Sequence, residues 1–224
     1  MITERSPYNG RVATAGAKRL PGRPPEGVRE AILETTHELI AERGVARLTT
    51  KAIARRGGFS EASIYYHFAD KAALLEGVIL EGVLAPFQAF TASYAERGSE
   101  RGLKEGLLEF TGALSVFWER ILPLLSAVQS DAELRNRFRA RLNKLDLGPH
   151  RGVRLVTRFL LEQQDVGRVR DDIDPTRVAM LICSTCYLTG YNRHMLGAKA
   201  RGRLPSIEST VSALLDLVTG SPPT

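Results

Sequence analysis

Helical periodicity runs through this chain from residue 26 onward, and this feature limits the fold class more than any other. Apolar residues recur at helical spacing over roughly 26–43, 71–96, 100–120, 121–129, 131–145, 149–165, 175–196 and 206–219. Glycines mark the breaks between many of these segments, where helix ends favour them. The sequence has no alternating pattern of the length that a half-buried strand requires. The fold class is therefore predicted to be all-α.

The composition is that of a globular protein. Apolar residues make up 43% of the 224 positions and charged residues 25%, which is close to ordinary globular usage. No stretch approaches the roughly 18 apolar residues that a membrane span needs, and the N-terminus lacks the apolar run of a secretory signal. Two cysteines form no disulfide framework. We expect a cytoplasmic protein with no membrane partner.

The net charge of +6 is concentrated in residues 1–25, which hold five basic residues and one acidic residue. This stretch is rich in Gly, Pro and Ala and lacks apolar periodicity, so it is predicted to be a disordered basic arm. Gly22-Arg23-Pro24 resembles an AT-hook core, in which an extended arginine enters a narrow minor groove. The alternative is a plain flexible tail that only adds solubility.

The first predicted helix carries an acidic stripe at strict four-residue spacing, formed by Glu26, Glu30, Glu34, Glu38 and Glu42. Like charges at this spacing repel one another modestly. The stripe is therefore expected to face water, and it is unsuited to a phosphate backbone.

Two short helices joined by a glycine turn follow. Thr49-Thr50 offers an N-cap for a helix through Arg56, Gly57-Gly58-Phe59 is a tight turn, and Ser60 caps a helix through about Phe68. Asp70 caps a third helix. This layout is typical of a helix-turn-helix. Ile64 and Phe68 are four residues apart and share one face, which is predicted to pack on Ile53 and Phe59. The opposite face is small, polar and aromatic, and it suits a major groove.

The string from Thr50 through Lys71 and Leu75 resembles the TetR family of bacterial regulators over about residues 28–77. The resemblance implies that 60–68 is the recognition helix. It implies contacts to the DNA backbone from Thr50, Tyr66, His67 and Lys71. It implies a groove-facing set of Lys51, Glu61, Ala62, Ser63 and Tyr65. The implied domains are a DNA-binding domain over 26–72 and a helical ligand-binding and dimerisation domain over 73–224.

The predicted function is a ligand-responsive repressor. Pairing of two chains through about 175–196 and 206–219, as the resemblance implies, would set the recognition helices about 34–36 Å apart on a near-palindromic operator of double-stranded DNA. A small, mostly apolar effector would release the DNA by preferring another state. One alternative is a helical binding protein or enzyme with a vestigial motif. Another is a structural or activating regulator without a ligand, whose C-terminal domain only dimerises.

Basicity alone does not carry the DNA interpretation. Residues 26–71 hold seven basic and seven acidic residues, so this segment has no net charge. The acidic residues are concentrated on the first helix, whereas the basic ones belong mostly to the later part. A polarised surface is therefore predicted, and the interpretation rests on the motif.

Aromatic residues at helical spacing in the C-terminal domain indicate either a ligand pocket or ordinary core packing. The candidate pocket residues are Phe110, Trp118, Phe159 and Tyr187, of which Trp118 and Tyr187 would supply polar groups.

Cys183 and Cys186 have C-x-x-C spacing inside an apolar helix, which favours buried packing over a redox or metal switch. No two histidines have metal-ligand spacing, and no catalytic or cofactor motif is found. We predict no catalytic residue, metal or cofactor.

Overall fold

The computed structural model describes residues 27–200 and 202–220, so the predicted arm over 1–25 lies outside the described residues. Every regular element in this part is helical, which confirms the all-α fold class. The α-helices are α1 (Val28–Arg43), α2 (Thr50–Gly57), α3 (Glu61–His67), α4 (Lys71–Gly77), α5 (Ala85–Arg97), α6 (Leu103–Ser130), α7 (Ala132–Lys144), α8 (Pro149–Asp165), α9 (Pro175–Leu196) and α10 (Ile207–Thr219). Short 3-10 turns are η1 (Val45–Arg47), η3 (Gly98–Glu100) and η4 (Gly197–Ala200).

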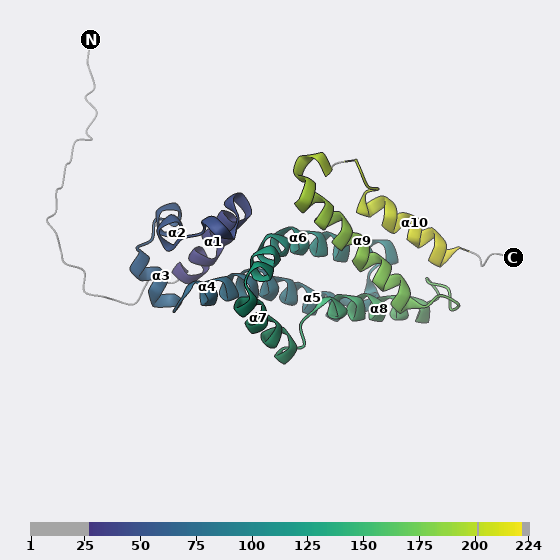
Figure 1. Ribbon diagram of the computed structural model, residues 1–224. Helices are drawn as coiled ribbons and strands as arrows, with labels where there is room; N and C mark the ends of the chain where they lie inside the picture. The colour runs from purple at the N-terminus through teal and green to yellow at the C-terminus, as the bar shows by residue number, and fades with distance from the viewer. Residues whose placement is uncertain (1–26, 201, 221–224) are drawn as a thin grey trace, which may run out of the picture.

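The helices α1, α2 and α3 form a compact unit, here called the head, at one end of the molecule (Figure 1). A continuous helix leads away from it and consists of α4, the π-helical segment η2 (Val78–Leu84) and α5. The remaining helices form the body, in which α9 packs against both α6 and α8, and α10 lies against α6 and α9. π-Helical turns are rare and often occur at functional positions. This one lies where the helix passes from the head into the body.

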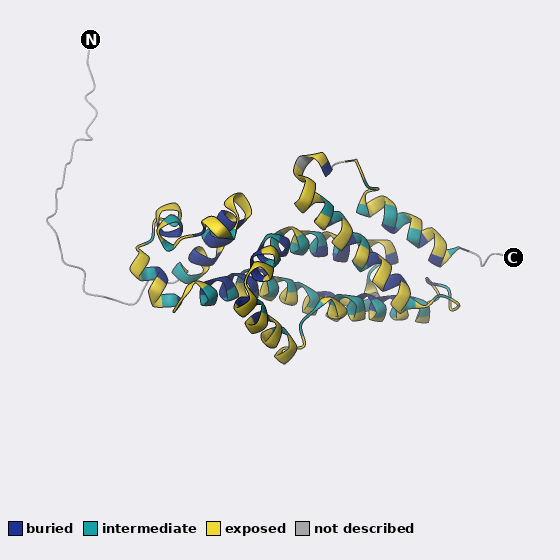
Figure 2. Cartoon of the chain, in the orientation of Figure 1, coloured by how far each residue is buried: buried dark blue, intermediate teal, exposed yellow. Residues whose placement is uncertain are grey.

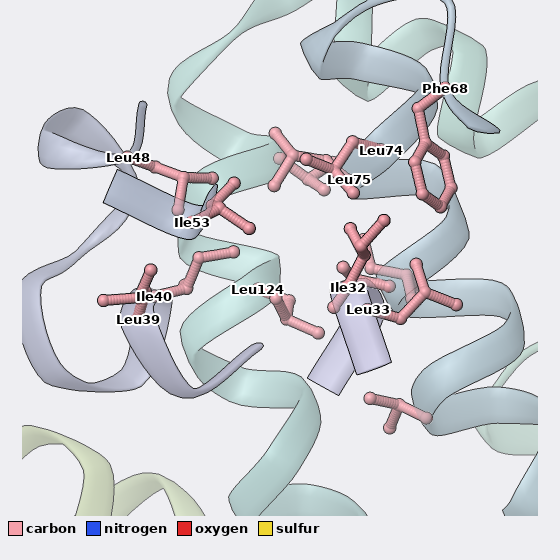
Figure 3. Close-up of a cluster of buried hydrophobic side chains, with 14 of the residues drawn as sticks. Ile32, Leu33, Leu39, Ile40, Leu48, Ile53, Phe68, Leu74, Leu75 and Leu124 are labelled. Carbon is pink, nitrogen blue, oxygen red and sulfur yellow. The ribbon is translucent and has the colours of Figure 1, made fainter. Parts of the chain in front are cut away.

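One hydrophobic core joins the head to the body (Figure 3). Ile32 on α1, Ile53 on α2 and Leu74 on α4 are at most 1% exposed, and Leu124 of α6 is fully buried among the same cluster. The head therefore packs directly on a helix of the body. A second core lies farther along the body around Tyr94, Phe110, Phe159 and Ile182.

The helix α6 is single where the sequence analysis expected two segments, 100–120 and 121–129. It continues through Pro123. A proline inside a helix costs about 3 kcal/mol. The neighbouring side chains of Ile121, Leu122 and Leu124 are all buried, and full burial of one such side chain contributes about 1.5–3 kcal/mol. Packing therefore outweighs the lost backbone hydrogen bond.

The continuous helix Lys71–Arg97 is long and apolar enough to cross a membrane by length and composition, contrary to the expectation from the sequence. Its buried side chains are those of Leu74, Leu75, Val78, Ile79, Val83 and Tyr94, which belong to the two cores. Its other side carries exposed polar residues such as Glu81, Gln88 and Glu96. The apolar composition of this helix is explained by its position between the two cores.

Candidate nucleic-acid interface

The turn between α2 and α3 has the geometry that the glycine pair predicts. Gly58 has a φ of 71°, a left-handed conformation that favours glycine. A Cβ at Gly57 would lie 2.0 Å from the ring of Phe59, so a side chain there would displace this ring. The turn directs Ile64 and Phe68 into the core, where they are 1% and 3% exposed beside Ile53. The predicted anchoring face of the second short helix is confirmed.

The three predicted N-caps of this region are also present. The side chain of Thr49 accepts a hydrogen bond from the backbone N–H of Ala52 at 3.1 Å, and Ser60 accepts one from Ser63 at 3.0 Å. Asp70 accepts one from Ala73 at 2.6 Å. Each cap satisfies a helix N-terminal donor that would otherwise be unpaired. The caps set where α2, α3 and α4 begin, and hence which side chains stand at the outer surface.

The outer face of α3 consists of the residues predicted to face the groove or the DNA backbone. Glu61, Ala62, Tyr65 and Tyr66 are exposed, with the two tyrosines at 57% and 66%. Ser63 is half-buried, and its hydroxyl lies 2.9 Å from that of Ser60. The helix therefore presents short and aromatic side chains to solvent, with no long aliphatic chain among them.

The ring of His67 is half-buried and lies edge-on to Tyr66, with ring centroids 5.1 Å apart. Its Nε2 atom is buried and has no hydrogen-bond partner among the described residues. Of the predicted backbone-contacting set, this side chain is therefore less accessible than Tyr66.

A hollow of about 230 Å³ opens beside α3, between the starts of α2 and α4. Its lining combines an apolar floor with a polar rim, namely Leu48, Thr49, Thr50, Ile53, Tyr65, Lys71 and Leu74. The ammonium group of Lys71, one of the lining residues, donates a hydrogen bond to the backbone carbonyl of Val45 at 3.3 Å. Hydroxyl and ammonium donors that converge on one hollow are suited to holding a phosphate group.

Thr50 and Glu61 are in contact, although the sequence separates them by 11 residues. The hydroxyl of Thr50 donates a hydrogen bond to Oε2 of Glu61 at 2.6 Å. This contact joins the first residue of α2 to the first residue of α3. No periodicity or spacing in the sequence signals it, because it depends on how the turn folds the two helices together.

The described members of the acidic stripe, Glu30, Glu34, Glu38 and Glu42, are exposed, as predicted, and Glu26 lies outside the described residues. Three of these exposed carboxylates also pair with arginines. Oε1 of Glu42 lies 2.6 Å from Arg56 of α2, and Oε2 of Glu38 lies 3.6 Å from the same guanidinium. The bond from Arg56 lowers the pKa of the Glu42 carboxyl. Glu34 forms two hydrogen bonds with Arg120 of α6, at 3.1 and 2.6 Å, and these lower its pKa. Glu34, Glu38 and Glu42 therefore bind arginines of neighbouring helices.

Basic side chains remain available around α3. In the described part of the chain, Arg47, Lys51 and Arg55 form no ion pair with a carboxylate, and all three are exposed. The carboxylates of α1 pair instead with Arg56 and Arg120. Three carboxylates of α1 are thus paired with arginines, whereas Arg47, Lys51 and Arg55 keep their charge free of ion pairs.

Polar contacts fasten the head to the body at two places. Besides binding Glu34, Arg120 approaches the carbonyl of Gly82 in η2 at 3.5 Å, and its own carbonyl accepts a hydrogen bond from His37 at 2.9 Å. Arg29 of α1 binds Glu81 of η2 and lies 4.4 Å from the ring centre of Phe68. Any shift of α6 or η2 relative to α1 would break some of these contacts.

The four candidate pocket residues of the C-terminal part do not meet at one point. Phe110 and Phe159 are 0% and 2% exposed, and both rings contact that of Tyr94. Trp118 instead lies edge-on to Tyr187, with ring centroids 4.9 Å apart. The two pairs are linked by a continuous chain of ring contacts through Phe90, Phe87 and Phe117. The body therefore contains an aromatic interior rather than one isolated cluster.

A run of apolar residues on α9 is exposed, and we call it the α9 apolar face (Figure 2). It consists of Met180, Leu181, Tyr187, Leu188, Tyr191 and Met195, which are 43–62% exposed. Leu217 on the neighbouring α10 is 66% exposed. Contiguous apolar surface of this kind marks an interaction site in soluble proteins.

The two cysteines of α9 are free thiols, with Cys186 buried and Cys183 half-buried. Burial raises the pKa of Cys183 to about 11 and that of Cys186 to about 12. Both groups are therefore protonated and unreactive near neutral pH. In the described residues no group of three potential metal ligands comes together. These observations favour the packing interpretation of the C-x-x-C pair.

Comparison with known proteins decides the family. Residues 32–78 match the model of bacterial regulatory proteins of the tetR family. The chain is 30% identical over 204 residues to the HTH-type transcriptional repressor AcnR of Corynebacterium efficiens, and the match covers 89% of this chain and 95% of that protein. The chain belongs to the TetR family of bacterial regulatory proteins. The resemblance inferred from residues 28–77 is thereby confirmed.

Other TetR-family proteins share a shorter stretch or the fold. The class D tetracycline repressor of Escherichia coli is 29% identical over 86 residues, which is 38% of this chain and only 39% of that relative's length. Among solved structures, SmeT of Stenotrophomonas maltophilia in complex with triclosan has a TM-score of 0.57 at 21% identity, over 89% of this chain and 98% of that one. At this identity the structural likeness supports the fold alone.

The structure confirms the buried anchors Ile64 and Phe68 and the exposed outer face of α3, and the contacts of this face with DNA stay predictions. The exposed face of α3, the position of Lys71 and the buried anchors all follow from residue types at fixed spacing. The Thr50–Glu61 contact and the hydrogen bonds of Arg120 with α1 were not predicted from the sequence. Both join residues far apart along the chain, and no local pattern reports them.

Proposed function

We propose that this TetR-family chain is a ligand-responsive transcriptional repressor that binds a near-palindromic operator as a homodimer. The observation that carries the proposal is the exposed face of α3, anchored from beneath by Ile64 and Phe68, with Lys71 and Tyr65 lining the same hollow beside it. Small side chains permit close approach to base edges, and the flanking cations hold phosphates. The proposal places the protein in the cytoplasm with its DNA and assigns it no catalytic activity.

The DNA contacts divide into two groups. Tyr66, His67 and Lys71 hold the phosphate backbone and set the register of the head on the duplex. The side chains that enter the major groove are Lys51, Glu61, Ala62, Ser63 and Tyr65. The hollow beside α3, which is lined by Thr49, Tyr65 and Lys71 among others, supports a phosphate-binding site at this edge of the interface. Backbone contacts give affinity without sequence information, whereas base contacts specify the site.

Dimerisation uses the α9 apolar face together with α10. Six apolar side chains of α9 that are 43–62% exposed form a self-complementary surface for a second copy of the chain. A two-fold axis that passes beside α9 and runs along the head-to-body direction would place both heads on the same side of the dimer. Recognition helices about 34–36 Å apart would then meet successive major grooves on one side of the duplex.

The effector is a small, mostly apolar molecule bound in the aromatic interior of the body. The chain of ring contacts from Phe159 to Tyr187 supports an apolar or aromatic ligand, and the complex of SmeT with triclosan is an example from a structural neighbour. α6 carries Phe110 and Trp118 and also Arg120, which contacts α1. A ligand that displaces α6 would therefore move the head, provided it prefers that state.

The experiment that tests the proposal is selection of operators from random DNA by the full chain, followed by binding titrations. Wild-type protein is expected to enrich a near-palindrome and to bind it as two protomers. Lys71→Ala should weaken binding to every sequence and reduce the slope of log K against log salt by about one. Glu133→Gln, an exposed position in the first turn of α7, is the control and should bind as wild type. Failure to enrich any sequence would refute the proposal.

A further inference from the structure

The hydroxyl of Thr50 is already engaged within the protein. It donates to Oε2 of Glu61 at 2.6 Å, and a threonine hydroxyl has only one proton to donate. While this bond exists, Thr50 cannot also donate its hydroxyl proton to a phosphate. The role that the family resemblance assigns to Thr50, a backbone contact through its side chain, is thus not available in this arrangement.

The same hydrogen bond positions a carboxylate at the DNA-facing end of α3. Glu61 is exposed and is the first residue of that helix. No arginine or lysine of the described residues forms an ion pair with it. Oε2 accepts the hydrogen bond from Thr50, and no hydrogen bond to Oε1 is found within the described residues. A carboxylate oxygen accepts hydrogen bonds, so Oε1 can accept one from a donor on DNA.

We propose that Glu61, positioned by Thr50, selects a cytosine in each half of the operator. Cytosine presents its N4 amino donor in the major groove, the group that Glu accepts from. Guanine presents two acceptors, N7 and O6, and thymine presents O4 and a methyl group, so each repels or excludes a carboxylate. Adenine carries a donor at N6 but has the N7 acceptor beside it. Cytosine is the base without a neighbouring acceptor on its own edge.

The inference rests on the proposed function and deepens it, because it names the base that one residue reads. It assigns Glu61 a second effect. A negative charge at the interface opposes close approach to phosphates when no amino group offsets it. Glu61 therefore lowers affinity for non-cognate DNA as well as raising it for the correct site. Thr50 acts as a positioning residue for this carboxylate.

The test begins with operator selection by wild-type protein and by Glu61→Gln, with Glu133→Gln as the matched control in the first turn of another helix. Wild type and the control should enrich a cytosine at one position of each half-site. Titrations of the selected operator and its three single-base variants should show a preference for cytosine of about five- to tenfold, the lower end of what a base contact contributes. In Glu61→Gln this preference should fall below twofold or move to adenine, which a glutamine can contact at N6 and N7.

Thr50→Val provides the second arm, because it removes the hydroxyl, keeps the shape and leaves the Thr49 cap in place. Its expected result is a reduced preference for cytosine with little change in binding to non-cognate DNA. A uniform loss of affinity for all four sequences would place the hydroxyl on a phosphate and overturn the inference. An unchanged cytosine preference in Glu61→Gln would also overturn it. If wild type enriches no sequence, the proposed function itself fails, and this assignment fails with it.

Discussion

Replacing Leu124 with alanine should destabilise the head and the body together. Leu124 belongs to α6 but is fully buried in the cluster formed with α1, α2 and α4 (Figure 3). The substitution removes three carbon atoms, which costs about 2.4 kcal/mol at roughly 0.8 kcal/mol for each buried methylene. A cavity term is added because the site cannot collapse completely, and measured Leu→Ala changes in cores lie at about 2–5 kcal/mol. We expect a loss of about 3–4 kcal/mol in the free energy of unfolding.

The assay is urea unfolding at one fixed protein concentration, since dimerisation makes stability depend on concentration. Far-UV circular dichroism reports the helices of the whole chain. The fluorescence of Trp118, the one tryptophan of the sequence, reports the body. The unfolding midpoints reported by both signals should move to lower urea concentration by the same amount. The slope of the unfolding free energy against urea concentration should stay unchanged. Leu145→Ala, at a residue that is 42% exposed outside the proposed interfaces, should change the free energy by less than about 1 kcal/mol.

Two results would refute this reasoning. A loss below about 1 kcal/mol for Leu124→Ala would mean that the site is not packed as described. A shift in the circular dichroism signal with no shift in Trp118 fluorescence would mean that the head unfolds independently of the body. In that case the shared core would not transmit structural change from α6 to the recognition helix.

Three further predictions address the interface, the packing of α9 and its thiols. Leu188→Asp places a charge in the middle of the α9 apolar face, where the native residue is 54% exposed. Analytical ultracentrifugation of this variant should show a monomer. A persistent dimer would place the dimer interface elsewhere. Gly190→Ala would put a Cβ 2.9 Å from Cβ of Trp118. The melting temperature should fall by an amount equivalent to about 1–3 kcal/mol. An unchanged melting temperature would contradict this close approach. Because burial raises the pKa of Cys183 to about 11, its labelling rate by a disulfide reagent should rise about tenfold for each pH unit between pH 8 and 10. A rate that levels off between pH 9 and 10, as for an exposed thiol of ordinary pKa, would contradict the burial.

Local patterns explain why the helix starts, the glycine turn and the buried face of α3 were predictable. Thr49, Ser60 and Asp70 cap helices because their side chains bond to amides only three residues away. Ile64 and Phe68 share a face because four residues make about one turn. The glycine turn needs the left-handed conformation found at Gly58. Each of these features lies within a few residues along the chain, so residue type and spacing were sufficient to place the outer face of α3.

The body was less predictable, because its contacts join distant positions. The four candidate pocket residues were chosen by aromatic character and helical spacing, and the structure distributes them along one chain of ring contacts. Likewise, the break expected near residue 120 is absent because buried neighbours of Pro123 keep α6 continuous. Aromatic residues favour burial and proline favours a break in a helix. The packing around each residue determines where an aromatic ring lies and whether a helix continues through a proline.

The sequence alone determined that the chain is all-helical, where α2, α3 and α4 begin, and which face of α3 is buried. These properties depend on interactions within one or two helical turns. The tertiary structure alone decided that Thr50 is bound to Glu61 and that Glu34 and His37 of the acidic first helix bind Arg120 of α6. Such contacts arise only when helices far apart in sequence are packed together. A side chain's partner is then set by the geometry of the whole core, which no local pattern records.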